Sequence, residues 1–152
     1  MKKFFLTSLA VISCAVAASR VEKVRNERVI AYEVTLEPAE AESGPEELPS
    51  LTVFLTDGTI LATAPEGRRG PLAVKRGEVF YQAAGAAPLR AVGTTEMRFV
   101  RIEFPGKAST EVWGTRGYPP SYRTLVVNGF VRAYDILMKA GGGEPLHTHH
   151  DR

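Results

Sequence analysis

Three histidines stand close together in the segment Pro145 to Arg152. Alternate residues of an extended segment point to the same side, so His147 and His149 present two imidazoles that could grip one divalent metal ion such as iron, manganese or zinc. Two ligands alone bind weakly, and useful sites need a third and usually a fourth donor, often a carboxylate. The sequence therefore predicts half of a metal site, and the alternative is a solvated segment that picks up metal adventitiously.

Other catalytic signatures are missing from the sequence. The single cysteine, Cys14, lies in the apolar N-terminal segment, and neither a Gly-x-Ser-x-Gly elbow nor a phosphate-binding glycine loop occurs. The 19 basic and 17 acidic residues are scattered along the chain and give a net charge of +2, so no nucleic-acid groove is predicted. We therefore expect that this chain alone is not an enzyme, and the sequence predicts no particular small-molecule ligand.

Residues 1–18 have the three parts of a secretory signal, namely a basic start, an apolar run over 4–12, and small residues up to Ala18. The run is shorter than the roughly 20 residues that a membrane helix needs. Two cut sites fit: residues 15–17 suit an ordinary signal peptidase, whereas residues 11–14 resemble a bacterial lipoprotein box that would place lipid on Cys14. We expect an exported protein, periplasmic or secreted, that meets a membrane only if Cys14 is lipidated.

After the signal segment, short strand patterns recur at even spacing, and no helical periodicity follows residue 20. Turn pairs such as Asp57-Gly58 and Arg76-Gly77 separate them. The acidic segment Ala39 to Ser50 reads as a surface loop, and residues 106–122 read as a linker. This pattern predicts an all-β barrel or sandwich. The expected strands are 28–37, 51–56, 59–64, 72–75, 79–82, 89–92, 96–104 and a segment from Arg123.

An internal repeat relates the segments that begin at Asn26 and Asn128, with an offset of 102 residues. Tyr32 meets Tyr134 and Glu42 meets Glu144, and the strand pattern between them is shared. The same offset places Pro45 opposite His147 and Glu47 opposite His149. We expect residues 123–152 to be the start of a second copy that is cut short.

The first copy resembles the cupin superfamily, whose small jelly-roll barrels typically carry one metal ion held by histidines from two sequence boxes. Gly58 fits the last glycine of the first box, and counting back from it places the histidine pair on Pro45 and Glu47 and the acidic position on Leu51. In the second box Gly77 and Gly85 are kept, but Pro88 stands at the histidine position. The resemblance therefore implies a cupin-like barrel at residues 26–105 with no metal cofactor of its own.

Two functions follow from this resemblance. We expect an exported, non-catalytic cupin-fold module with a binding, interaction or structural role, as the degenerate half of a two-cupin protein. The alternative is a metal-dependent cupin enzyme, an oxygenase or isomerase, built on His147 and His149 with residues beyond Arg152. A homodimer through barrel edge strands is a further expectation, with Arg123 to Met138 as the free edge. The predicted apolar lining of the barrel comprises Leu51, Val53, Leu55, Tyr81 and Phe99.

Overall fold

The computed structural model describes residues 18–43, 47–64, 67–110 and 121–143, and every regular element in these ranges is a β-strand. The strands, in chain order, are β1 (Ser19–Arg25), β2 (Ile30–Leu36), β3 (Ser50–Phe54), β4 (Gly58–Thr63), β5 (Arg69–Val74), β6 (Val79–Gln82), β7 (Arg90–Val92), β8 (Met97–Glu103), β9 (Tyr122–Val127) and β10 (Arg132–Ile136).

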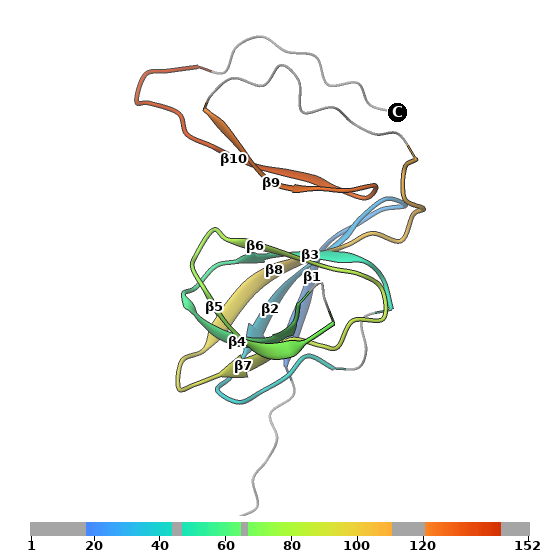
Figure 1. Cartoon of the computed structure of the whole chain (residues 1–152), viewed down its shortest axis with the longest axis vertical. Coiled ribbons are helices and arrows are strands. Elements are labelled where there is room, and N and C mark those ends of the chain that lie inside the picture. Colours follow the sequence, from blue (N-terminus) through green and yellow to red (C-terminus); the bar gives the residue numbers. More distant parts are fainter. Residues whose placement is uncertain (1–17, 44–46, 65–66, 111–120, 144–152) are drawn as a thin grey trace, which may run out of the picture.

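Eight of these strands form a barrel from two facing antiparallel sheets (Figure 1). The larger sheet has the order β1-β2-β8-β3-β6, and the smaller has the order β5-β4-β7. Strands far apart in sequence are neighbours, since β8 lies between β2 and β3. This interleaving is the jelly-roll arrangement, and it confirms the predicted all-β cupin-like fold.

Most expected strands are present with ends that differ by a few residues. The structure adds β1, which the sequence did not predict. All seven of its residues are exposed, so it has none of the buried apolar positions on which a strand prediction depends. It pairs with β2 along its whole length, with a shift of register between Glu22 and Val24.

The apolar core lies between the two sheets. The larger sheet contributes Val34, Leu36, Phe54, Met97 and Phe99, and the smaller sheet contributes Ile60, Ala62, Val74 and Ala91. Phe54 and Phe99 meet edge to face with ring centroids 6.0 Å apart. Because these side chains are almost fully buried, their packing supplies the main apolar contribution to the stability of the barrel.

Two glycines assigned to the cupin boxes have structural reasons. A Cβ atom on Gly58 would clash with the Sδ atom of the buried Met97, so a larger residue at this position would force Met97 to shift. Gly77 has a φ angle of +86°, a left-handed conformation that other residues rarely adopt. Both glycines are therefore explained by the structure of the barrel, without reference to a bound ligand.

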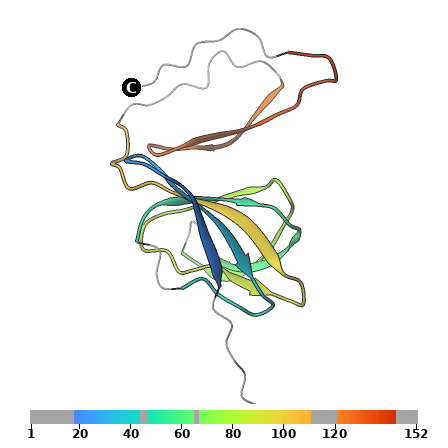
Figure 2. The same cartoon turned by 180° about the vertical axis from the view of Figure 1, so that it is seen from behind.

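The β9–β10 hairpin forms a separate layer outside the larger sheet (Figures 1 and 2). It contacts the barrel through β6, and the Phe130 ring of its turn stacks on Phe104 at the end of β8 with centroids 6.2 Å apart. The backbone N–H of Ser109 donates to the Gly129 carbonyl at 2.7 Å. The hairpin is thus fixed to the barrel at its turn, just after the last barrel strand.

The proposed signal lies almost wholly outside the described residues, which begin at Ala18. Within the described ranges no helix is long and apolar enough to span a membrane.

Candidate functional site

The inward-facing side chains of β8 change from apolar to charged along the strand. Met97 and Phe99 point into the apolar core, and Arg101 and Glu103 follow on the same face because alternate residues of a strand point the same way. The same change occurs on β3, where Phe54 lies in the core and Ser50 pairs with Glu103. The barrel interior is therefore divided into an apolar layer and a polar layer.

The Arg101 guanidinium lies at the centre of the polar layer, and its side chain is completely buried. Its Nη2 atom lies 2.5 Å from Glu42 Oε2 and donates to Gln82 Oε1 at 3.1 Å, while Nη1 donates to Ser50 Oγ at 3.0 Å. The acceptors come from the segment after β2, from β3 and from β6. One guanidinium thus joins three separate parts of the barrel by charge-assisted hydrogen bonds.

Two of the three acceptors of Arg101 make a further hydrogen bond. Glu42 Oε2 also accepts the backbone N–H of Leu89 at 3.1 Å, and Gln82 Nε2 donates to the Ala87 carbonyl at 3.1 Å. These two contacts reach the turn between β6 and β7, where the resemblance places the metal ligand of the second box. The network therefore ties together the segments that would otherwise surround a metal ion.

A second arginine, Arg20 of β1, contacts the polar layer from the side of β1. Arg20 forms an ion pair with Glu103, whose side chain is 10 % exposed, and its guanidinium carbon lies 3.7 Å from the centre of the Tyr32 ring. This combination of ion pair and cation–π contact attaches the exposed strand β1 to the interior. The polar layer therefore has its own internal counter-charges on both sides.

The polar layer does not fit the metal site that cupin barrels typically hold. The described residues contain no group of three or more His, Cys, Asp or Glu side chains that could hold a metal ion. Of the two buried carboxylates of this layer, Glu42 faces the permanently charged Arg101 guanidinium and Glu103 faces Arg20, and both guanidinium groups would repel a divalent cation. The arrangement is suited to holding the barrel closed, and it places no nucleophile beside a base.

The positions to which the cupin boxes assigned ligands are dispersed. Glu47 is exposed and Pro88 is half-buried, with its carbonyl accepting a hydrogen bond from Arg69 at 3.1 Å. Pro45 lies outside the described residues, as do His147 and His149, so the predicted metal pair remains a prediction. The described box positions bring no set of ligands together.

Three residues of the predicted lining lie on the opposite face of the sheet. Leu51 pairs with Tyr81 and Ile102, whereas its neighbours in sequence face the interior. Val53 shares this outer face. Leu51 is buried there at 4% exposed, and Phe99 is the member of the predicted set that lies in the cluster between the two sheets. The prediction exchanged the two faces of β3. The inner face carries the hydroxyl groups of Ser50 and Thr52 before the apolar Phe54, whereas Leu51 and Val53 lie on the outer face. Burial on this outer face raises the pKa of Tyr81.

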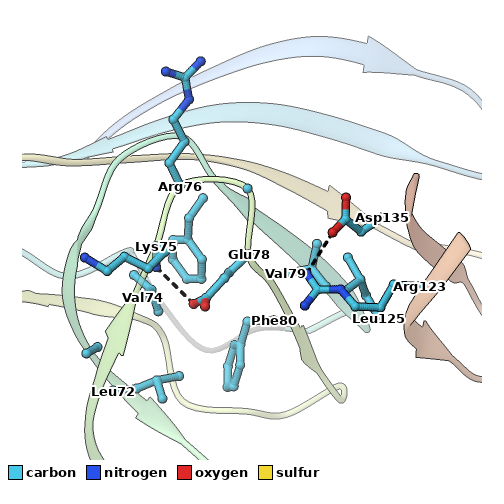
Figure 3. Close-up of a pocket in the computed structure, with 13 residues that line it drawn as sticks. Leu72, Val74, Lys75, Arg76, Glu78, Val79, Phe80, Arg123, Leu125 and Asp135 are labelled. Carbon is cyan, nitrogen blue, oxygen red and sulfur yellow. Dashed lines mark hydrogen bonds and ion pairs between the residues drawn. The ribbon is translucent and has the colours of Figure 1, made fainter. Parts of the chain in front are cut away.

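A cavity of about 630 Å3 lies between the β5–β6 turn and the hairpin (Figure 3). Its lining combines apolar side chains such as Phe80 and Leu125 with charged groups at the rim. Two of these charged groups have partners within the lining: Arg123 lies 2.9 Å from Asp135, and the Glu78 carboxylate accepts the backbone N–H of Lys75 at 3.0 Å. The cavity therefore lies between the hairpin and the barrel, and its lining contains one internal ion pair, Arg123 with Asp135.

Sequence reasoning missed the central residues of the polar layer. The sequence Met97 to Glu103 does carry the signal, since Arg101 stands in the same phase as Met97 and Phe99, where another apolar residue is expected. Glu42 has no such signal, because it belongs to an acidic segment that reads as surface loop. The structure instead buries Glu42, with its backbone N–H donating to Leu89 at 3.0 Å.

Comparison with known proteins gives matches among solved structures. A cupin domain from Bordetella pertussis Tohama I is similar, with a TM-score of 0.50 and 26% identity over 58% of this chain and 93% of that domain. An RmlC-like cupin family protein with a double-stranded β-helix fold, from Methanocaldococcus jannaschii, has a TM-score of 0.48 and 13% identity over 69% of this chain and 92% of its own. No family model and no curated protein matches. The chain therefore has the fold of the cupin superfamily.

Proposed function

We propose that this chain is an exported, non-catalytic cupin-fold module, in which a buried ion pair takes the place of the metal centre. The observation that carries the proposal is the completely buried Arg101 guanidinium, 2.5 Å from Glu42 and in contact with Ser50 and Gln82. A structural network of this kind leaves neither an open coordination position nor an acid or base beside one.

The role of such a module is binding or support of a neighbouring domain. The Arg101 guanidinium is completely buried and already holds Glu42, Ser50 and Gln82, so the protein itself uses the central charge of the interior. The exterior carries the hairpin, which covers part of the larger sheet beside β6. We therefore assign the function to outer surfaces of the barrel, with the interior serving to make the barrel rigid.

Metal analysis of the purified full chain tests this proposal. The parent protein is compared with a variant that carries both His147→Ala and His149→Ala, after dialysis against chelator and after incubation with iron, manganese or zinc. The proposal predicts that the variant holds far less than one metal ion per chain under every condition. One tightly held ion per chain in the variant would place a metal centre in the barrel and overturn the proposal.

The same experiment separates the alternative function. Tight, stoichiometric metal in the parent that is lost in the double variant would favour a metal centre built on His147 and His149. That result would support the metal-dependent enzyme for the C-terminal segment and leave the barrel as its metal-free support. Weak binding that dialysis removes would identify the histidines as an adventitious metal-binding segment.

A further inference from the structure

The hairpin β9–β10 reproduces the hairpin β1–β2 pair by pair. With the offset of 102 residues, the pairing of Arg20 with Val34 corresponds to the pairing of Tyr122 with Ile136. The other four pairs of the second hairpin correspond in the same way, and the sixth pair of the first hairpin, Ser19 with Thr35, corresponds to the hydrogen bond that the Leu137 N–H donates to the Ser121 carbonyl at 3.0 Å. Both ladders also shift register at the same place, where Lys23 in one strand and its counterpart Leu125 in the other are skipped. The two hairpins therefore share a bulge at equivalent positions, so the repeat seen in the sequence is also present in the backbone structure.

The turns of the two hairpins also match. Asn26 Oδ1 accepts the backbone N–H groups of Arg28 and Val29, both at 2.9 Å. Asn128 Oδ1 accepts the corresponding groups of Phe130 and Val131 at 2.8 and 3.0 Å. Each hairpin is therefore closed by the same side-chain turn between equivalent strands.

The two hairpins differ in what lies beside them. The second edge of β2 pairs with β8 along all seven residues, from Ile30 opposite Glu103 to Leu36 opposite Met97. Its counterpart β10 pairs only with β9 among the described residues. The apolar side chains at the end of β10 are also exposed, since Ile136 is 37% exposed and Leu137 and Met138, just after the strand, are 79% and 59% exposed. An open edge beside an exposed apolar face is a site at which another strand can add.

We propose that the open edge of β10 binds an antiparallel β-strand with the chemistry of β8. The charges of β8 suit β10 in the register that β8 has on β2. Glu103, opposite Ile30 on β2, would face Arg132, and Arg101, opposite Tyr32, would face the Tyr134 ring.

The remaining arginine of β8 also finds an acceptor. Arg98 lies 2.5 Å from Glu33, whose counterpart on β10 is Asp135. Glu33 holds Lys23 at 3.0 Å at the same time, so one carboxylate at this position can serve two cations. The existing pair of Asp135 with Arg123 therefore leaves the site able to accept an incoming arginine.

The occupant is a strand of a partner polypeptide that has the charges and apolar residues of β8. A second copy of this chain does not supply such a strand, because its own β8 is already paired on one edge with β2 and on the other with β3. The inference goes beyond the proposed function of the barrel, since it concerns the hairpin and does not depend on the metal content of the interior.

A binding titration with a labelled synthetic peptide tests the proposal. The probe has the sequence of residues 96–104, and the receptor is the full chain, compared with Ile136→Lys on β10 and Val92→Lys on β7. The two substituted residues are matched controls, 37% and 38% exposed. We expect saturable binding by the parent and by Val92→Lys, and affinity roughly tenfold lower or worse for Ile136→Lys.

A charge exchange fixes the register. The substitution Arg132→Glu in the chain should lower its affinity for the parent peptide. A peptide that carries Glu103→Arg should restore the affinity of this variant chain. Absence of binding by the parent chain, equal binding by the two lysine variants, or failure of the exchange would overturn the proposal. A concentration-dependent dimer of the parent that Ile136→Lys abolishes would assign the edge to a second copy instead and would also overturn it. Near-ultraviolet circular dichroism confirms that each variant is folded.

Discussion

The two layers of the barrel interior are equally buried but depend on different forces. The apolar layer around Phe54 and Phe99 is stabilised by packing, which is not directional and tolerates changes of similar volume. The polar layer around Arg101 depends on ion pairs and hydrogen bonds at defined distances, so loss of one partner leaves a buried charge without compensation. In a fold whose interior often holds a metal, this chain keeps a polar interior and neutralises it with its own side chains.

The largest effect is expected from breaking the polar layer on one side. Arg101→Ala leaves the Glu42 carboxylate buried without its counter-charge, which should cost about 3–5 kcal/mol of unfolding free energy. Arg98→Ala on the same strand is the matched control, because its ion pair with Glu33 has the same 2.5 Å separation but is solvent-exposed. Its cost should be at most about 1 kcal/mol. Urea unfolding measures both, and equal costs would contradict the distinction between the buried and exposed pairs.

A change in the apolar layer should have a somewhat smaller effect of a different kind. Leu36 is completely buried, and Leu36→Ala should cost about 3 kcal/mol through lost transfer energy and the cavity that remains. The loss should not depend on salt, because no charge is involved. Urea unfolding at low and high salt measures this, and a cost that falls with salt would show that the two layers are not separate.

Replacing both partners of the polar layer should have a small effect. Arg101→Met combined with Glu42→Leu removes the pair without leaving a buried charge, and the unfolding free energy should stay within about 1 kcal/mol of the parent. A double-mutant cycle with the single substitutions gives the coupling. A double variant as unstable as Arg101→Ala would show that the hydrogen bonds to Ser50 and Gln82, and not the charge balance, hold this layer.

The smallest effect concerns an exposed turn outside both layers. The backbone N–H of Arg76 and the Lys75 ammonium hold the pKa of Asp57 below its usual range. Since the folded pKa is the lower one, this carboxylate contributes stability above the ordinary aspartate pKa, and the contribution is lost as pH falls toward the folded value. Asp57→Asn should therefore give a slightly flatter dependence of stability on pH in acid. The measurement is the unfolding free energy of the parent and of Asp57→Asn at a series of acid pH values. Two curves that superimpose would contradict this prediction.

The sequence was sufficient to predict the strands that alternate apolar and polar residues, because burial of one face leaves a period of two. It did not predict β1, whose residues are all exposed and which is held by Arg20 reaching Glu103 and Tyr32. The β3 strand was predicted with its faces exchanged, because its outer apolar residues resemble a core pattern. Such strands are positioned by tertiary contacts that local patterns do not encode.

The site was less predictable than the fold. The cupin boxes predicted a barrel without its usual metal ligands, and that absence of metal stays a prediction. What replaced them could not be read from the boxes, since Arg101 and Glu42 lie 59 residues apart in sequence and meet only when the barrel closes. An arginine in apolar phase on a strand was the one available signal of a buried ion pair.

The most direct test of the central claim measures unfolding of the chain that carries His147→Ala and His149→Ala, in chelator and in excess manganese or zinc. A ligand that binds the folded state raises the unfolding midpoint as its concentration increases. Because Arg101 already neutralises the interior, we predict the same urea midpoint in chelator and at every metal concentration. A midpoint that rises with metal concentration would show that the barrel holds a metal ion and would contradict the account.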